Sequence, residues 1–267
     1  MNRIHLLLCL AFAPLCLFSE VCDTASLRVT YVSRYANYAN PKSVRTDTMA
    51  LDVGKEQSHF YSLVQSHYEE RLAKLNAQNL PQWQAIAGAR KLGSQGQKIH
   101  IVKRPVGGDL MRCYDCFTLD FVAYEEADNR QDWRLEDADT VICGYKCRAA
   151  SADVRGRKWR VWYTEEIPLP DGPWKLHGLP GLILEAREAD GFYSFACVGI
   201  EKVNIEMAEL PERRYAECSF KDYLRLYYRY HDDPLLYLKN KFGTSIPSPA
   251  KRKSDVISIE CKPLRQK

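Results

Sequence analysis

The sequence predicts an α+β fold: a strongly curved antiparallel β-sheet forming an open half-barrel, with one or two covering helices. Three observations predict it. Between Lys98 and Val203, short runs rich in β-branched and aromatic residues alternate with brief polar turns. Strands joined by such short loops pair antiparallel, because parallel strands need long crossovers. Helical patterns flank this region on both sides, and no regular alternation of strand and helix suggests a doubly wound α/β fold.

The N-terminal part of this fold contains two predicted strands and one predicted helix. Residues 26–36 (SLRVTYVSRYA) are rich in β-branched and aromatic side chains, and residues 49–54 (MALDVG) end in a glycine, so both are typical of strands. The next apolar side chains follow a 3.6-residue period, which predicts a helix over 58–78 that packs one apolar stripe as core. The stripe consists of Phe60, Leu63, Val64, Tyr68, Leu72 and Leu75.

The central part of the chain is predicted to be almost entirely strand, with turns at PVGGD (105–109), EADNRQ (126–131), PLPDGP (168–173) and EADG (188–191). Alternation within 117–125 places every second apolar side chain on one face: Phe117, Leu119, Phe121 and Ala123. The predicted strands are KIHIVK (98–103), FTLDFVAYE (117–125), DWRLED (132–137), VICGYKCRAA (141–150), GRKWRVWYTEEI (156–167) and GFYSFACVGIEKV (191–203).

The C-terminal part changes character past Val203. Ser219 followed three residues later by Asp222 resembles a capping box, and an amphipathic helix over 219–230 is expected to dock on the sheet. Little order is expected beyond Phe242. The predicted organisation is a signal peptide (1–19), a β-rich domain (20–205), a helical extension (206–242) and a basic, mostly disordered tail (243–267).

The positive charge is concentrated in that tail. The whole chain carries a formal net charge of +4, and residues 239–267 hold eight Lys or Arg against two acidic residues, a net of +6. The remaining chain is therefore near −2, so the sequence does not predict a nucleic-acid-binding face. The tail is expected to be solvated and able to make peripheral contact with an anionic membrane surface.

The N-terminus has the features of a targeting segment. A short basic start (MNRIH) precedes an apolar stretch (LLLCLAFAPLCLF) that is too short to span a bilayer comfortably, and small residues precede Glu20. The residues before Cys16 and Cys22 do not fit a lipoprotein signal. The mature protein is therefore expected to be exported, to the periplasm, the cell envelope or the extracellular space.

The cysteines favour disulfides, because removal of residues 1–19 leaves an even number in an exported chain. A zinc site and a redox-active CYDC motif are the alternatives. If Cys143 and Cys147 lie on one strand, they are roughly 13 Å apart, beyond the limit of about 7 Å for a disulfide, unless Gly144 breaks the strand. The disulfide candidates are Cys22, Cys113, Cys116, Cys143, Cys147, Cys197, Cys218 and Cys261.

The stretch HGLPGLIL (177–184) excludes several motifs. It has neither the Gly-Lys-Ser/Thr ending of a phosphate-binding loop nor the three spaced glycines of a dinucleotide loop. No Ser or Cys stands between its glycines, so it is not a nucleophile elbow. A type II turn with Pro180 and Gly181 at its centre remains, because glycine supplies the positive φ required there. The turn residues are Gly178, Leu179, Pro180, Gly181, Leu182 and Ile183, and the last two begin a strand covered on both faces.

Three segments carry a family resemblance: GYKC (144–147), RGRKWRVWYTEEIP (155–168) and GPWKLHGLPGLILEA (172–186). Together they resemble the GLPGLI family, exported proteins of Bacteroidota named for the hexapeptide at 178–183. Ala149 and Val161 stand where Lys and Ala are usual in that family. The resemblance implies export to the envelope and carries no assigned biochemical activity. By analogy of fold, the half-barrel is expected to resemble that of bacterial lipoprotein carriers.

No catalytic constellation is predicted. His177, Glu165, Glu166 and Glu185 are the candidates for hydrolytic chemistry, but there is no HExxH motif and no serine in a glycine elbow. Accordingly, no catalytic residue, metal or cofactor is expected. A thiol oxidoreductase or a hydrolase remains the less favoured alternative.

Aromatic residues give the only binding signal. Trp159 and Tyr163 are expected on one face of their strand, and Trp162 on the other face with Lys158 and Arg160. We expect an exported, non-enzymatic protein that binds a lipid-like or other apolar ligand, or another envelope protein. A purely structural envelope protein is the alternative, and the same aromatic residues are then simply core. The candidate ligand-binding residues are Trp159, Trp162, Tyr163, Trp174, Phe192 and Phe195.

Overall fold

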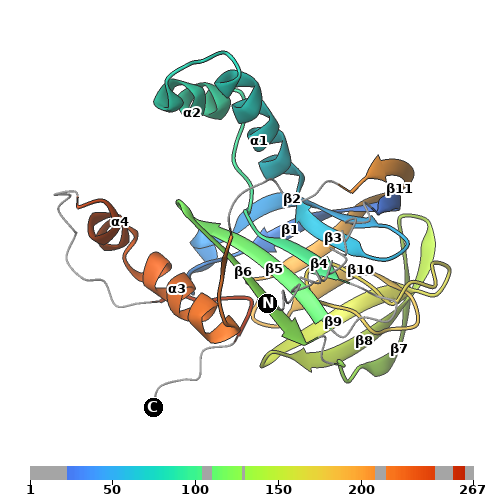
Figure 1. The fold of residues 1–267 in the computed structure, drawn as a ribbon. Coiled ribbons are helices and arrows are strands. Elements are labelled where there is room, and N and C mark those ends of the chain that lie inside the picture. Colours follow the sequence, from blue (N-terminus) through green and yellow to red (C-terminus); the bar gives the residue numbers. More distant parts are fainter. Residues whose placement is uncertain (1–22, 104–109, 128–129, 208–214, 244–254, 262–267) are drawn as a thin grey trace, which may run out of the picture.

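The computed structural model describes residues 23–103, 110–127, 130–207, 215–243 and 255–261 (Figure 1). These residues form one open sheet of twelve strands, in the order β12-β6-β5-β4-β3-β2-β1-β11-β10-β9-β8-β7. The strands are β1 (Thr24–Tyr35), β2 (Arg45–Val53), β3 (Ser58–Ser62), β4 (His100–Lys103), β5 (Leu110–Phe117), β6 (Asp120–Ala127), β7 (Arg134–Ile142), β8 (Tyr145–Val154), β9 (Arg157–Thr164), β10 (Leu182–Glu188), β11 (Ser194–Glu206) and β12 (Ala216–Glu217).

The sheet is antiparallel except for the short pairing of β12 with β6, which is parallel. The described helices are α1 (Leu63–Asn76), α2 (Gln82–Lys91), α3 (Phe220–Asp232) and α4 (Pro234–Phe242), with a 3-10 turn at Pro41–Ser43. The predicted class, an antiparallel sheet with helices, is therefore confirmed. The likeness of its curvature to lipoprotein carriers stays a prediction.

The prediction of one helix over 58–78 is wrong for its first turn. Residues 58–62 form β3, in which Ser58, Phe60 and Ser62 are buried while the residues between them are half-buried. This two-residue period satisfies a strand, and Phe60 fits both periods. The Oγ of Ser62 then accepts a hydrogen bond from the Gln65 N–H (3.0 Å) and starts α1.

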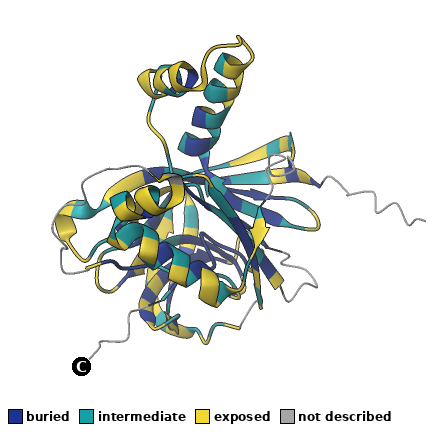
Figure 2. Ribbon diagram, turned by 60° about the vertical axis from the view of Figure 1, so that its left-hand side comes forward, coloured by how far each residue is buried: buried dark blue, intermediate teal, exposed yellow. Residues whose placement is uncertain are grey.

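The sequence predicts that the first helix covers the sheet. The helical hairpin of α1 and α2 does not cover it. Only Gln65 and Tyr68 of α1 are buried, and α2 packs against α1. Figure 1 shows the hairpin projecting from one end of the sheet, and Figure 2 shows that much of its outer surface is exposed. The predicted apolar stripe is therefore divided between a core strand and a protruding hairpin.

Two predicted strands are in fact hairpins. The run 117–125 turns at Thr118 (φ 61°), so that Phe117 ends β5 and Leu119 is exposed. The run 141–150 turns at Cys143 (φ 50°) and Gly144 (φ 86°). Gly144 therefore breaks the strand between Cys143 and Cys147, which is the exception named above in the argument about their separation.

The predicted C-terminal helix is confirmed as α3. Its N-cap Ser219 accepts a hydrogen bond from the Asp222 N–H (3.1 Å) through its side-chain oxygen. Tyr223 and Tyr227 of α3 are buried against Phe117 and Tyr124 of the sheet. In Figure 2 the buried positions of the sheet lie beneath this helix.

The prediction of a mostly disordered tail over 243–267 differs from the structure in one segment. Asp255–Cys261 packs against the core, and Val256, Ile257, Ser258 and Glu260 are buried there. The charge composition predicts a solvated tail. The adjacent apolar residues Val256 and Ile257, together with the ion-paired carboxylate of Glu260, nevertheless provide enough interactions for burial. The predicted signal peptide and the turn at 105–109 lie outside the described residues.

The glycines of HGLPGLIL do not adopt the predicted backbone conformations. The positive φ falls at Gly178 (88°) and not at Gly181, so the predicted type II turn is wrong. A Cβ at Gly181 would collide with the backbone carbonyl of Thr164. Glycine is therefore required at 181 for close approach of two backbones. The predicted strand after it is confirmed, because Leu182, Ile183 and Leu184 are fully buried in β10.

Candidate binding sites

Four of the predicted aromatic residues lie in the core. Trp159 contacts the rings of Trp174 (centroids 5.8 Å apart) and Phe195 (6.2 Å), and Tyr163 is fully buried nearby on β9. Phe192 is half-buried at the edge of the same cluster. These side chains stabilise the fold by apolar burial and ring packing.

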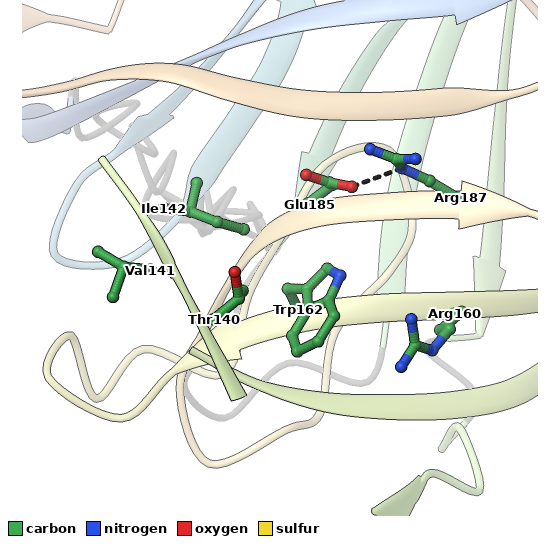
Figure 3. A pocket seen from close by; sticks show the side chains of 7 residues that line it. All are labelled: Thr140, Val141, Ile142, Arg160, Trp162, Glu185 and Arg187. Carbon is green, nitrogen blue, oxygen red and sulfur yellow. Dashed lines mark hydrogen bonds and ion pairs between the residues drawn. The ribbon is translucent and has the colours of Figure 1, made fainter. Parts of the chain in front are cut away.

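Trp162 lies on the opposite face of β9, as predicted, and lines a pocket with a volume of about 410 Å³. The Arg160 guanidinium lies over its ring, 4.8 Å from the centroid. Figure 3 shows the Trp162 side chain between Arg160 and the end of β7. The lining residues come from three strands and are Thr140, Val141, Ile142, Arg160, Trp162, Glu185 and Arg187.

The charges around this pocket are paired. Arg160 Nε donates to Glu136 (2.7 Å), and Arg187 Nε donates to Glu185 (2.5 Å). Exposed pairs of this kind contribute little to stability. Because each charge has an opposite partner, the rim around the Trp162 ring carries no unpaired charge from Arg160, Glu185 or Arg187.

A second pocket, with a volume of about 570 Å³, shares Thr140 and Val141 with the first. The end of β7 therefore separates two neighbouring hollows. The other residues that line this second pocket are Asp139, Lys146, Cys147, Arg148, Glu165 and Glu166.

Strand β7 is one end of the described sheet. Its pairing with β8 shifts register between Glu136 and Asp139, so the strand is irregular in its middle. Two apolar side chains of this edge strand are largely exposed, Leu135 (57%) and Val141 (65%). An edge strand with exposed apolar residues is a template for pairing with another chain.

The carboxylates considered for hydrolysis are engaged elsewhere. Glu165 pairs with Arg148 (3.1 Å), and a Glu166 oxygen accepts from the Lys146 N–H (2.8 Å). The carbonyl of His177 accepts from the Trp133 indole (2.8 Å). These candidates thus have separate partners: Glu165 and Glu166 line the second pocket, Glu185 lines the first, and His177 lines neither. Within the described part of the chain, no three His, Cys, Asp or Glu side chains gather as metal ligands would.

The predicted disulfides are not present among the described cysteines. Cys22 lies outside the described residues, and no disulfide joins any two of the described cysteines, which are Cys113, Cys116, Cys143, Cys147, Cys197, Cys218 and Cys261. The Cys143 and Cys197 sulfurs nevertheless lie 3.7 Å apart. Burial raises the pKa of Cys113 and of Cys197 to about 12 and that of Cys147 to about 11, so these thiols are protonated at neutral pH.

A buried ion cluster near the C-terminal segment was not predicted from the sequence. Glu260 accepts from Lys175 Nζ (2.6 Å) and from Trp174 Nε1 (3.1 Å), and Arg155 Nη1 lies 3.3 Å from it. Glu126 of β6 also pairs with Lys175 and, at 2.5 Å, with Arg155. Two cations and two carboxylates thus neutralise one another in the interior.

Ionisation in this cluster is stabilised by the pairing. Burial alone would lower the pKa of Lys175 and Arg155, but the neighbouring acidic groups outweigh it and both pKa values are raised. Burial opposes ionisation of Glu126, yet Lys175 and Arg155 hold its pKa below the ordinary value of 4.5. Lys175, Arg155 and Glu126 are therefore charged near neutral pH.

A comparison with protein-family models gives one match: a family described as "Protein of unknown function (Porph_ging)" matches residues 153–185. The GLPGLI-type proteins belong to this family, and the predicted resemblance is confirmed. The GLPGLI match spans β9, the turn and the first half of β10. It carries no activity. No curated protein matches the chain.

Solved structures similar to this chain include two crystal structures of PNGF-II, in space groups P21 and C2. Their TM-scores are 0.52 and 0.50, each at 12% identity, and each match covers 79% of this chain. The match covers only 34% of each PNGF-II chain. At this identity the likeness describes the fold alone.

Among the described residues, no helix has the length and apolar character needed to cross a bilayer.

Proposed function

We propose that this chain is an exported, non-enzymatic binding protein of the cell envelope, and that it holds an extended segment of another envelope protein along β7. The observation that carries the proposal is the position of the Trp162 pocket at the end of an edge strand. An extended segment gains main-chain hydrogen bonds by adding to a sheet edge, and pockets beside that edge select its side chains.

The chemistry of the pocket favours an uncharged aromatic or aliphatic side chain. Trp162 offers an apolar ring, and the charges on the rim are already paired with one another. A charged group entering the pocket would lose water without meeting an unpaired opposite charge. The exposed Leu135 and Val141 extend the apolar character along the strand.

A photo-crosslinking residue at Val141 tests this site in the native envelope. Val198 is the matched control, because it is also an exposed valine on a strand (57%) and lies on β11. We expect a crosslinked product at Val141 and not at Val198, in which peptide mapping identifies one segment of one partner. Equal crosslinking at the two positions would contradict the proposal.

A synthetic peptide of the mapped segment then provides the quantitative test. Trp162→Ala should weaken its binding by at least about tenfold, as expected for a central aromatic anchor. Trp83→Ala removes another exposed tryptophan, on α2, and should leave the affinity unchanged. Equal affinities for the Trp162 variant and the parent would refute the role of the pocket.

A lipid-like ligand within a carrier-like half-barrel is the second candidate. It is supported by the aromatic residues Trp159, Trp174 and Phe195 on the inner side of the sheet, although these side chains pack against one another. Native mass spectrometry and solvent extraction of protein purified from its own envelope test it. Recovery of a stoichiometric lipid would favour this candidate over the β7 site, and its absence would exclude it.

A further inference from the structure

The segment Asp255–Cys261 lies against the sheet without being a strand of it. It makes only isolated bridges, one of which joins Val256 to Tyr38, and its Ile257 N–H donates to the Asn37 carbonyl (3.0 Å). The residues on both sides of it, 244–254 and 262–267, lie outside the described part of the chain. The segment is extended over 255–257 and turns over 258–261, where Ser258 bridges to Cys261, so it contacts the rest of the protein as a short peptide that ends in a turn would.

The segment's carboxylate occupies a charged site that the other residues of the protein build. Lys175 is a buried cation, Arg155 beside it is a half-buried one, and Glu126 supplies one negative charge. Without Glu260 the site would hold one uncompensated positive charge in a buried position. An unpaired buried charge is strongly unfavourable, so this site requires an anion.

The cationic site is fixed by contacts that do not involve the segment. The Lys175 carbonyl accepts from Gln131 Nε2 (2.6 Å), and Lys175 Nζ is 3.0 Å from the Tyr124 hydroxyl. The Arg155 guanidinium lies over the Phe220 ring, 5.1 Å from its centroid. Such pre-organisation lowers the entropic cost of binding an anion there.

The segment's backbone is also recognised. Arg157 donates to the Ser258 carbonyl through Nη2 (2.7 Å) and Nε (3.1 Å), and the Tyr227 hydroxyl donates to the Ile257 carbonyl (2.9 Å). Arg157 is itself held by Glu188 (2.8 Å). Main-chain recognition of this kind is suited to a polypeptide, because a fatty acid has no such row of carbonyl groups.

We propose that these residues form a peptide-binding groove, distinct from the β7 site, whose resident occupant is the chain's own Asp255–Cys261. The groove takes a short peptide with two adjacent apolar residues, followed by a turn that carries a glutamate three positions after the second, as in Val256, Ile257 and Glu260. The resident segment exchanges with the same segment of a second copy of the chain.

Exchange can be measured with the full chain cut at one place. A protease recognition site replaces residues 247–250, and cleavage leaves both fragments present. A fluorescent, end-blocked peptide of residues 255–261 is then added in excess, and its incorporation into folded protein is followed by anisotropy and size-exclusion chromatography. We expect stoichiometric incorporation that unlabelled peptide reverses.

The carboxylate is tested on the peptide, so that the fold of the protein is unaffected. The Glu260→Gln peptide should bind at least about tenfold more weakly, because its amide leaves the buried positive charge uncompensated. The Asp255→Asn peptide is the matched control and should bind like the parent, since Asp255 is exposed. Equal affinities for the Glu260→Gln peptide and the parent peptide would overturn the anion site.

Failure of the labelled peptide to enter the cut protein would overturn the proposal, whether the cut segment stays or the protein unfolds without it. Displacement of the peptide by a saturated fatty acid at lower concentration would replace the peptide by a lipid as the ligand class. Mixing cut protein with uncut, differently labelled copies distinguishes the sources. A dimer supports entry of the segment of a second copy, and peptide entry without a dimer would overturn the second copy as its source.

Discussion

Oxidation is expected to join Cys143 and Cys197. The Cys143 thiol is exposed at the tip of the β7–β8 hairpin, and its sulfur lies 3.7 Å from that of the buried Cys197 on β11. Glutathione disulfide supplies the oxidant. Cys143 as thiolate attacks it and releases one glutathione thiol, and Cys197 then displaces the second, so that two protein thiols become one disulfide and one glutathione disulfide becomes two thiols.

The magnitude follows from the separation of the two residues in the chain. They are 54 positions apart, and closing a loop of that length lowers the entropy of the unfolded chain by an amount equivalent to about 4 kcal/mol. Closing the sulfurs to a bond length of about 2 Å takes a small movement of an exposed hairpin tip, so little of this stabilisation should be lost as strain. A gain of about 4 kcal/mol corresponds to a shift of the urea midpoint by at least about 1 M.

The assay compares oxidised and reduced protein by urea unfolding, with peptide mapping of the linked residues. Cys143→Ser is the control, and it should show no gain on oxidation. Because burial raises the pKa of Cys197 to about 12, the second step should be slow at neutral pH and faster above it. Mapping that shows another pair, or a bond between Cys143 and Cys197 without a change in midpoint, would refute the reasoning.

Three further predictions concern stability. Burial lowers the pKa of His59 to about 3 and of His231 to about 4. The neutral histidines therefore contribute fully to the stability of the fold above pH 6.5, and this contribution is lost as the pH falls towards 4. Urea titrations should show the free energy of unfolding dropping by about 1.4 kcal/mol per pH unit for each histidine. A pH-independent free energy in that window would contradict this. Gly181→Ala should cost about 3 kcal/mol, because its Cβ meets backbone, whereas Gly178→Ala, with open space around it, should cost about 1–2 kcal/mol; equal thermal shifts would show that the close approach is unimportant. Asp171→Asn leaves a buried lysine without its carboxylate and should cost about 3–5 kcal/mol, and a loss below about 1 kcal/mol would show that the pair is dispensable.

The sheet could be predicted from the sequence because its strands alternate clearly. In β9 the alternation predicted opposite faces for Trp159 and Trp162, and this is confirmed: Trp159 is buried and Trp162 is half-buried on the other face. The errors fell where two periods overlap or where a turn lacks a recognisable signal. Phe60 fits a helical stripe and a strand equally well. Thr118 adopts a positive φ, although a threonine at that position gives no sign of a turn.

The sites could be predicted only in part. Trp162 was among the candidate residues because of its type and its face, but the pocket beside it is also lined by the end of β7, which follows a register shift that the sequence does not reveal. Glu260 was not predicted at all. Its environment depends on pairing with Lys175, 85 positions away, and composition gives no information about such a contact.

The GLPGLI hexapeptide gains a physical role from these contacts. Gly181 lets β10 begin directly against the Thr164 backbone, and the Ile183 N–H bonds to the Asp171 carbonyl (3.0 Å). Asp171 in turn pairs with the buried Lys103, which also donates to the Gly172 carbonyl (2.7 Å). The chain between these anchors, residues 172–182, is thereby held against the sheet.

That held stretch includes Trp174 and Lys175, and the family match over 153–185 also contains Arg155 and Arg157. The residues that contact the Glu260 carboxylate and the Ser258 backbone thus lie within the matched segment, whereas their occupant lies outside it. The turn has no binding side chain of its own, but it positions the adjacent residues Trp174 and Lys175, which donate to the Glu260 carboxylate. The hexapeptide therefore acts as the support of the proposed groove, and Gly181→Ala should weaken peptide exchange even where enough protein stays folded to measure it.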